Sequence, residues 1–208
     1  MCYHFNNGAV DLKKAIKAFD GEDYHHEFET RGSINAFTKA DMPYIPAIVN
    51  YNGIVLMNTF WGTQEHPDAP TKCKNLKSEN TFTYYRKIEK NRCLIPASSY
   101  YEHKTIVVPG KKTPVKQKHE MFWKNKEQFY IAAFYDLYKD GNIGFGLITT
   151  IPNPVQAEIH HRMIITLDEK MGREFLDQKP IEEFQFPEYS PSLFFENLEP
   201  EKNIKTLF

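Results

Sequence analysis

The hydrophobic residues of this chain recur mostly in short continuous or alternating runs, a pattern of β-strands rather than of long helices. Residues 45–61 hold two such runs. The dipeptide Asn52-Gly53 between them is typical of a tight turn, so this region predicts a β-hairpin. Further strands are predicted at residues 93–101, 129–137 and 144–150, with a turn at 139–142 joining the last two.

Helical periodicity is confined to short segments. Residues 10–19 place apolar side chains on one face with lysines between them, which predicts an amphipathic helix. Other helices are predicted at residues 81–89, from Pro154 to His160, and at 168–177. Residues 104–120 are lysine-rich around Pro109-Gly110 and predict a mobile hairpin or loop, and the proline-rich region from 180 to 200 is predicted to be irregular.

Strands therefore dominate the predicted structure. An aromatic content of 14% is consistent with packed sheets. We predict a single domain over residues 1–208 of the α+β class. Its core is a curved, largely antiparallel, barrel-like sheet with short peripheral helices.

Charge and cysteine usage narrow the classes of function. The net charge is −1, whereas a purely electrostatic binder of nucleic acid is usually basic, so any DNA contact must come from a local patch. Three cysteines without a Cys-x-x-Cys pair predict neither a disulfide framework nor a zinc site, and we expect no metal or cofactor. No apolar run is long enough to span a membrane, and the start lacks the order of a signal peptide. The expected location is the cytoplasm, with nucleoid association when DNA is bound.

Cys2 follows the initiator methionine directly. Removal of Met1 would leave an amine and a thiol on adjacent carbons, and an α-amine with a pKa of about 8 is partly neutral at pH 7. Such a pair can condense with an aldehyde to an imine, which the thiol then closes into a five-membered thiazolidine. Taken alone, Cys2 is better explained as a small apolar residue near a frayed terminus.

Three further segments contain residues suited to catalysis or binding. Glu102 follows an apolar strand, where partial desolvation would raise its pKa and suit proton transfer, or it is a solvated carboxylate at a strand end. Of His160 and His161, either one faces a functional site while the other points outward, or both are surface residues. Asn75 and Lys77 precede a predicted helix, so they either contact a sugar or phosphate or belong to a capping segment.

Together and in order, these motifs resemble the SOS-response-associated peptidase (SRAP) family of abasic-site processing proteins. The family patterns are a Met-Cys start, Asn-Ala-Arg-x-Glu, Arg-Cys-Leu-x-Pro followed by two aromatics and Glu, and His-x-Arg-Met-Pro. They correspond here to Met1-Cys2, Asn75–Glu79, Arg92–Glu102 and His160–Met163, and Trp61-Gly62 stands where the family has Trp-Gly. The resemblance spans essentially the whole chain.

The resemblance implies a function and a role for each residue. The function is protection of abasic sites in single-stranded DNA through a covalent thiazolidine crosslink during replication and repair, as part of the SOS response. Independently of the resemblance, we expect a monomer. Strand cleavage by β-elimination and removal of Met1 by autoproteolysis are implied side activities. Cys2 would be the nucleophile, Asn75 would orient the terminus or the sugar, Glu102 would be the general acid and base, and His160 would help to open the sugar ring. The implied DNA contacts are Lys77, Arg86, Arg162, Trp61 and His103.

This chain departs from the family pattern at three positions. Lys77 replaces an arginine and loses bidentate phosphate geometry. His103 replaces a tryptophan, so a base-stacking surface is in doubt, and Ile164 replaces a proline. A compensating basic patch is available in the lysines at 72, 74, 77, 111, 112, 116 and 118, at least half of which we expect to be merely solvated.

Two other functions fit the same residues. Cys2, His160 and Glu102 could form the nucleophile, base and orienting group of a cysteine peptidase that acts in trans. Alternatively, the chain is a non-enzymatic reader of modified or single-stranded DNA, in which Cys2 is incidental. A covalent adduct that depends on Cys2 separates these hypotheses.

Overall fold

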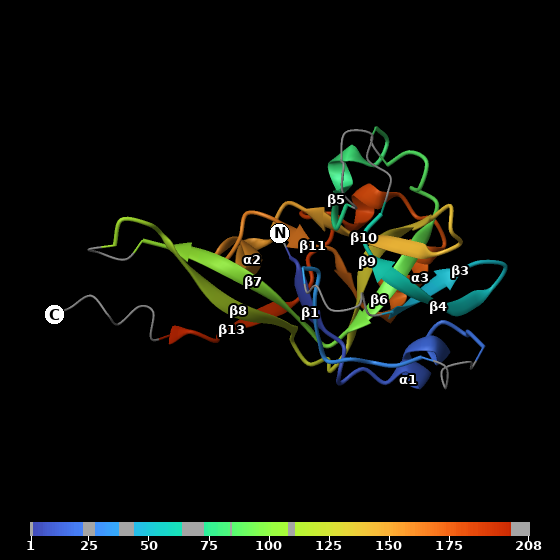
Figure 1. Ribbon diagram of the computed structural model, residues 1–208, viewed down its shortest axis with the longest axis horizontal. Coiled ribbons are helices and arrows are strands. Elements are labelled where there is room, and N and C mark those ends of the chain that lie inside the picture. The colour runs from blue at the N-terminus through green and yellow to red at the C-terminus, as the bar shows by residue number, and fades with distance from the viewer. Residues whose placement is uncertain are drawn as a thin grey trace.

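The computed structural model describes residues 2–22, 28–37, 44–63, 73–83, 85–107 and 111–200. Its strands form two sheets, with few and short helices around them, which confirms the predicted fold class (Figure 1). None of the helices in these ranges is long and apolar enough to cross a membrane.

The larger sheet closes on itself into a barrel. Strands β4, β3, β6, β9 and β10 pair in that order, and β10 returns to pair with β4, the only parallel contact among them. The predicted hairpin at 45–61 is present as β3 and β4, with Asn52 and Gly53 at positive φ in the turn. The bounds are β3 Ile45–Asn50, β4 Ile54–Trp61, β6 Arg92–Ala97, β9 Phe129–Leu137 and β10 Ile143–Thr150. Short strands β5 Asn75–Lys77, β11 Met163–Ile164 and β12 Thr166–Leu167 extend this sheet.

The smaller sheet has the order β13-β8-β7-β1-β2. Its bounds are β1 His4–Asn6, β2 Ser33–Asn35, β7 Ser99–Ile106, β8 Val115–Trp123 and β13 Leu193–Asn197. Strands β7 and β8 form a long hairpin that projects away from the barrel (Figure 1). Of the two alternatives predicted for 104–120, a hairpin or a loop, the hairpin is present, and its residues 108–110 lie outside the described ranges.

The single strand predicted at 93–101 is wrong, because the chain bends at Ser98. The Ser98 N–H donates to Asn6 O over 2.8 Å, so the strand leaves the barrel as β6 and joins β1 in the other sheet as β7. Glu102 therefore lies within β7 and is buried, instead of standing at a strand end.

The helices are shorter than predicted. They are α1 Leu12–Lys17, α2 Pro154–Ala157 and α3 Glu169–Leu176, each preceded by an Asp or Asn whose side chain accepts from the first turn. The helix predicted at 81–89 is wrong: a 3-10 turn at Ser78–Asn80 is followed by further turns. The hydroxyls of Thr81 and Thr83 donate to the carbonyls three residues earlier, which competes with a helical ladder.

The region after residue 180 is also more regular than predicted. A 3-10 helix runs over Ile181–Phe184, and β13 pairs antiparallel with β8 along its whole length. Leu193 and Phe195 of β13 face the side of β8 that carries Met121 and Trp123, so apolar pairing outweighs the irregular signal of the nearby prolines.

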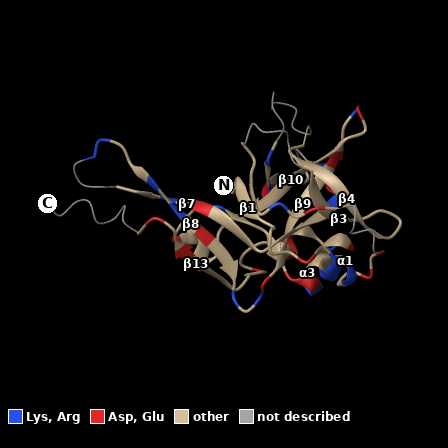
Figure 2. Ribbon diagram, turned by 60° about the horizontal axis from the view of Figure 1, so that its bottom comes forward, with Lys and Arg blue, Asp and Glu red and all other residues tan. Residues whose placement is uncertain are grey.

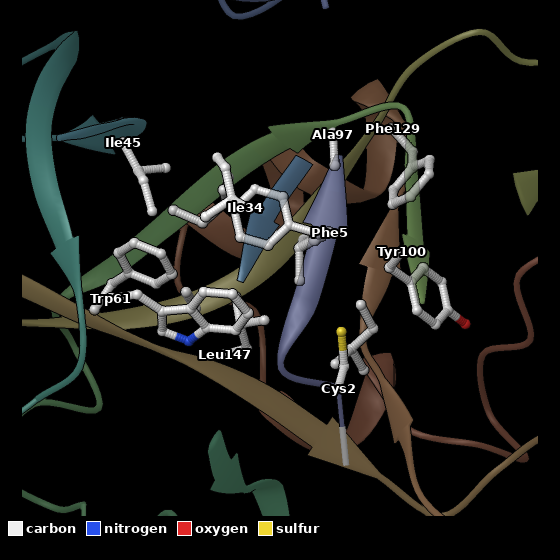
Figure 3. Packing of buried hydrophobic residues seen from close by; sticks show 14 of the residues in the cluster. Cys2, Phe5, Ile34, Ile45, Trp61, Ala97, Tyr100, Phe129 and Leu147 are labelled. Carbon is white, nitrogen blue, oxygen red and sulfur yellow. The ribbon is translucent and has the colours of Figure 1, made fainter. Parts of the chain in front are cut away.

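Two apolar clusters flank the barrel wall. One fills the barrel and the space beneath the smaller sheet, and the other lies between the outer barrel surface and helices α1 and α3. Cys2, Phe5 and Tyr100 belong to the first cluster (Figure 3). The N-terminal segment is therefore built into the core, so that residue 2 has a fixed position.

Gly144 in β10 marks the point where the barrel closes. A Cβ at this position would overlap the Gly62 carbonyl oxygen and the Tyr138 hydroxyl that donates to it. We expect Gly144→Ala to lower the free energy of unfolding by about 1–3 kcal/mol, because a packed interior absorbs added volume poorly. Urea unfolding followed by tryptophan fluorescence measures this, and an unchanged midpoint would contradict the close packing described here.

Candidate functional site

A pocket of about 420 Å³ opens beside the N-terminal segment. Tyr3 and His4 form one wall, and β7 of the smaller sheet contributes Glu102. His160, in the loop that follows α2, also lines the pocket, although it is far from the other lining residues in the sequence. Residues separated by more than 150 positions in the sequence thus meet around one hollow.

Cys2 directly precedes Tyr3 of the pocket lining, but it is buried and does not line the pocket itself. Its thiol donates to His4 O over 3.2 Å, and only 1% of the residue is exposed. Burial raises the pKa of the Cys2 thiol well above its usual range, and the negative charge of Glu102 raises it further. The sulfur is therefore held as a neutral thiol within the electrostatic reach of Glu102.

Asn75 fixes the backbone of residue 2. Its Nδ2 donates to Cys2 O over 2.9 Å, from strand β5, which β10 holds at the barrel edge. Within the described residues, Asn75 Oδ1 is buried and accepts no hydrogen bond. Asn75 thus offers one further acceptor close to the main chain of Cys2.

Glu102 is a carboxyl with 2% of its surface exposed. Desolvation by burial raises its pKa to about 7, while the backbone N–H of His103 opposes this shift. At neutral pH both the acid and the carboxylate are well populated, as proton transfer in both directions requires. The sequence predicts this raised pKa from partial desolvation at a strand end, but its source here is burial within the strand.

His160 is a half-buried, neutral imidazole. Desolvation lowers its pKa to about 4, although a hydrogen bond to Arg162 opposes this. Nδ1 lies 3.2 Å from the Arg162 carbonyl oxygen and 3.0 Å from the Arg162 N–H, so the backbone of Arg162 holds the ring in place. A neutral imidazole has one N–H, so His160 can donate one hydrogen bond without carrying a charge.

A buried glutamine links the strand of Glu102 to the loop of His160. Gln156 accepts from the Tyr100 hydroxyl over 2.8 Å and donates to Arg162 O over 3.1 Å. Both Gln156 and Tyr100 are fully buried, so this bridge fixes the loop against β7. Sequence reasoning misses Gln156, because no motif distinguishes it from a surface residue of a short helix.

Arg162 is placed differently from its expected role as a phosphate contact. The guanidinium makes a bidentate pair with Glu79 at 2.6 and 2.9 Å and also donates to Thr149 O. Arg162 is buried, whereas Glu79 is exposed, and their ion pair neutralises the charge of the guanidinium. Arg162 thus joins the segment after β5 to the His160 loop, which is a structural function.

Trp61 also departs from its expected role. The indole is 3% exposed and packs against Phe5 and Phe145, and its Nε1–H donates to Lys74 O. A ring packed in the core in this way offers no face to a DNA base, so its burial argues against the predicted DNA contact at Trp61. Its place at the end of an apolar strand already favours a core position.

The other three expected DNA contacts remain accessible. His103 is exposed and lines the pocket. Lys77 and Arg86 are exposed but lie outside the pocket wall. Within the described ranges, no group of three or more histidine, cysteine, aspartate or glutamate side chains is arranged to hold a metal ion.

Known proteins share both sequence and fold with this chain. The family model described as SOS response associated peptidase (SRAP) matches residues 1–193. Two proteins of Bacillus subtilis (strain 168), the abasic site processing proteins YoqW and YobE, are 31% and 30% identical over 115 residues. These matches cover 53% of the chain and 47% and 48% of the relatives, so the similarity spans about half the length of each curated relative.

Solved structures extend the likeness of fold to nearly the full chain. A protein from Bacteroides thetaiotaomicron matches with a TM-score of 0.70 at 20% identity, covering 96% of this chain and 93% of that one. A protein from Bordetella bronchiseptica matches with a TM-score of 0.71 at 17% identity, covering 95% and 99%. At these identities the likeness establishes the shared fold and nothing about the chemistry.

Proposed function

Because the chain belongs to the SOS response associated peptidase (SRAP) family, we propose that it processes abasic sites in DNA by bonding covalently to them through Cys2. The observation that carries this proposal is that Glu102 and His160 line one pocket with Tyr3, while Cys2 directly precedes Tyr3 and lies within the electrostatic reach of Glu102. Relatives named abasic site processing proteins agree with it.

The proposed reaction begins when Met1 is removed and the α-amine of Cys2 becomes free. The amine attacks the aldehyde carbon of the ring-opened sugar, and loss of one water leaves an imine. The Cys2 sulfur then bonds to the imine carbon, and the thiol proton ends on the nitrogen. The product is a thiazolidine, formed from amine, thiol and aldehyde with one water released and no oxidant or reductant.

Each neighbouring side chain has a part in this reaction. Glu102 in its acid form protonates the departing hydroxyl, and its carboxylate later relays the thiol proton to the imine nitrogen, which suits a pKa of about 7. The neutral His160 donates its ring N–H to the ring oxygen of the sugar as the ring opens. Asn75 holds residue 2 through Cys2 O, and its buried Oδ1 is available to accept from the freed amine.

We propose single-stranded DNA as the substrate. A pocket recessed between β1 and β7 must receive a nucleotide that is out of a base stack, which costs least in a single strand. Lys77, Arg86 and His103 are exposed and are the proposed phosphate contacts, and Arg162 acts indirectly by holding the His160 loop.

The alternative of a peptidase acting in trans is less well supported. Thiol peptidases use a cysteine whose pKa is lowered by a neighbouring positive charge. Here burial and Glu102 raise the pKa of Cys2, and its thiol donates to a backbone carbonyl and not to a histidine. An imine-forming amine needs no such thiolate, because the sulfur attacks only after the imine has formed.

The requirement for a free terminus gives a direct test. We expect the untagged protein to form a band that survives a denaturing gel with an abasic single-stranded oligonucleotide. A short N-terminal extension that is not removed should abolish the band, because the nitrogen of Cys2 is then an amide.

The control for this test uses the same extension, placed after a protease site whose cleavage leaves Cys2 as the first residue. Cleavage should restore the band. Equal crosslinking by the extended and the cleaved protein would refute the proposed chemistry.

A further inference from the structure

Phe37 is an aromatic side chain that the proposed reaction does not use. It is 65% exposed, yet it lines the pocket together with Tyr3. The two ring centroids lie 4.6 Å apart at an interplanar angle of 50°. An apolar ring exposed at the mouth of a polar pocket indicates a ligand with an apolar face.

The backbone that carries the two rings is held by hydrogen bonds. The Phe37 N–H donates to Asn35 Oδ1 over 2.9 Å, and the Ala36 N–H donates to Tyr3 O over the same distance. Pairing of β1 with β2 fixes His4 opposite Asn35, directly before this turn. The backbone of the aromatic pair is therefore ordered in the free protein, which lowers the ordering entropy that binding costs.

The opposite rim of the pocket is cationic. In the β7–β8 register Thr105 faces Lys116 and His103 faces Lys118, so these four side chains share one face of the hairpin. Lysines continue along the outer half of the hairpin (Figure 2). Lys116 and His103 line the pocket, and Lys118 Nζ lies 4.0 Å above the Tyr101 ring.

A nucleotide has a flat base and a negatively charged phosphate. The aromatic side of the pocket suits the base, and the cationic side suits the phosphate. We propose that the base next to the abasic nucleotide stacks on Phe37 and Tyr3 while the backbone phosphate lies against Lys116. This specificity surface deepens the function proposed above and rests on it. Tyr3 follows Cys2 directly, so a base stacked there adjoins the reacting sugar.

The same surface explains how the protein could bind DNA with His103 at the position where the family has a tryptophan. A smaller, polar ring at that position is a weaker platform for a base. Phe37 reaches the pocket from the segment after β2, on the side away from β7, so stacking comes from a different wall. The predicted loss of a stacking surface at His103 is thus compensated within the same pocket.

The test measures binding without covalent chemistry. An oligonucleotide of single-stranded DNA carries one tetrahydrofuran residue, which lacks the aldehyde, and fluorescence anisotropy gives Kd. A second oligonucleotide has tetrahydrofuran also at both flanking positions, which removes the neighbouring bases. We expect Phe37→Ala to weaken binding of the first about 5- to 150-fold, the range for one base–aromatic stack, and to leave binding of the second unchanged.

Matched variants separate stacking from a general loss of structure. Phe37→Trp should keep the affinity of Phe37 for the first oligonucleotide. Tyr51→Ala removes another exposed ring, 63% accessible and outside the pocket, and should alter neither Kd. Single replacements at the 5′ or the 3′ flank then show which base occupies the surface.

Two outcomes would overturn the proposal. Phe37→Ala could weaken both oligonucleotides equally, which would make Phe37 a structural residue. It could also change neither, as expected if the exposed ring docks another protein. Failure of the proposed function is distinct from both, because the wild-type protein would then form no band with a reactive abasic oligonucleotide.

Discussion

Replacing Cys2 by alanine is expected to abolish the crosslink to abasic DNA that survives a denaturing gel. Once Met1 is removed, the Cys2→Ala protein still presents an α-amine and can form an imine, but it has no sulfur to close the ring. The imine hydrolyses in water, so the band should fall to background. Borohydride reduces an imine to a stable amine, and its addition should recover a band for this variant.

This pair of measurements distinguishes the three functions that fit the sequence. A non-enzymatic reader would bind DNA equally well with or without Cys2 and would give no band in either case. A peptidase acting in trans would lose amide hydrolysis without any effect of borohydride. Cys93→Ala is the matched control, because it removes a buried sulfur from the same apolar cluster and should leave the crosslink intact. A full-strength band from Cys2→Ala without borohydride would contradict the thiazolidine.

The fold was largely predictable, because strand periodicity follows from local sequence. The hairpin at 45–61 and the strands near 129–137 and 144–150 appear where their apolar runs place them. The bend at Ser98 was not predictable, because the apolar run continues through it and only the pairing with β1 decides where the strand changes sheet. The turns after Ser78 likewise depend on threonine hydroxyls that compete with helical hydrogen bonds.

The candidate site divides in a similar way. Cys2, Glu102 and His160 are recognisable from motifs. The structure brings Glu102 and His160 to one pocket and places Cys2 within the electrostatic reach of Glu102. The positions of the other predicted residues depend on burial, which the motifs do not indicate. Trp61 and Arg162 have side chains typical of DNA contacts, yet Trp61 is packed in the core and Arg162 is paired with Glu79. Phe37 and Gln156 lie in no motif, and only three-dimensional packing reveals their positions.

Glu102→Gln is expected to slow crosslink formation about 100- to 10,000-fold, the usual contribution of a general acid or base. Glutamine has the same shape but neither supplies nor takes a proton. Glu196→Gln on β13 is the matched control, because Glu196 is exposed and outside the pocket, and it should react at the wild-type rate. Single-turnover rates from a time course of denaturing gels give both values.

The pH dependence of the same rate should change in shape. In the wild type the acid form of Glu102 is lost as pH rises through about 7, while the neutral fraction of the α-amine grows toward its pKa of about 8. These opposing trends predict a rate maximum between the two values. Without Glu102 the falling limb disappears, so the residual rate of Glu102→Gln should rise with pH and then level off.

Stability measurements separate this catalytic effect from unfolding. The folded protein holds the Glu102 proton more tightly than the unfolded chain, with a pKa of about 7 against 4.5, so this group makes the fold less stable as pH rises through that window. Removing the charge should therefore raise the free energy of unfolding at pH 8 by up to about 3 kcal/mol, while leaving it nearly unchanged at pH 4. A protein that is more stable and yet far slower would identify Glu102 as a proton-transfer group whose burial lowers the stability of the fold. A loss of stability at pH 8, or a wild-type rate, would show that the buried carboxyl serves the fold instead.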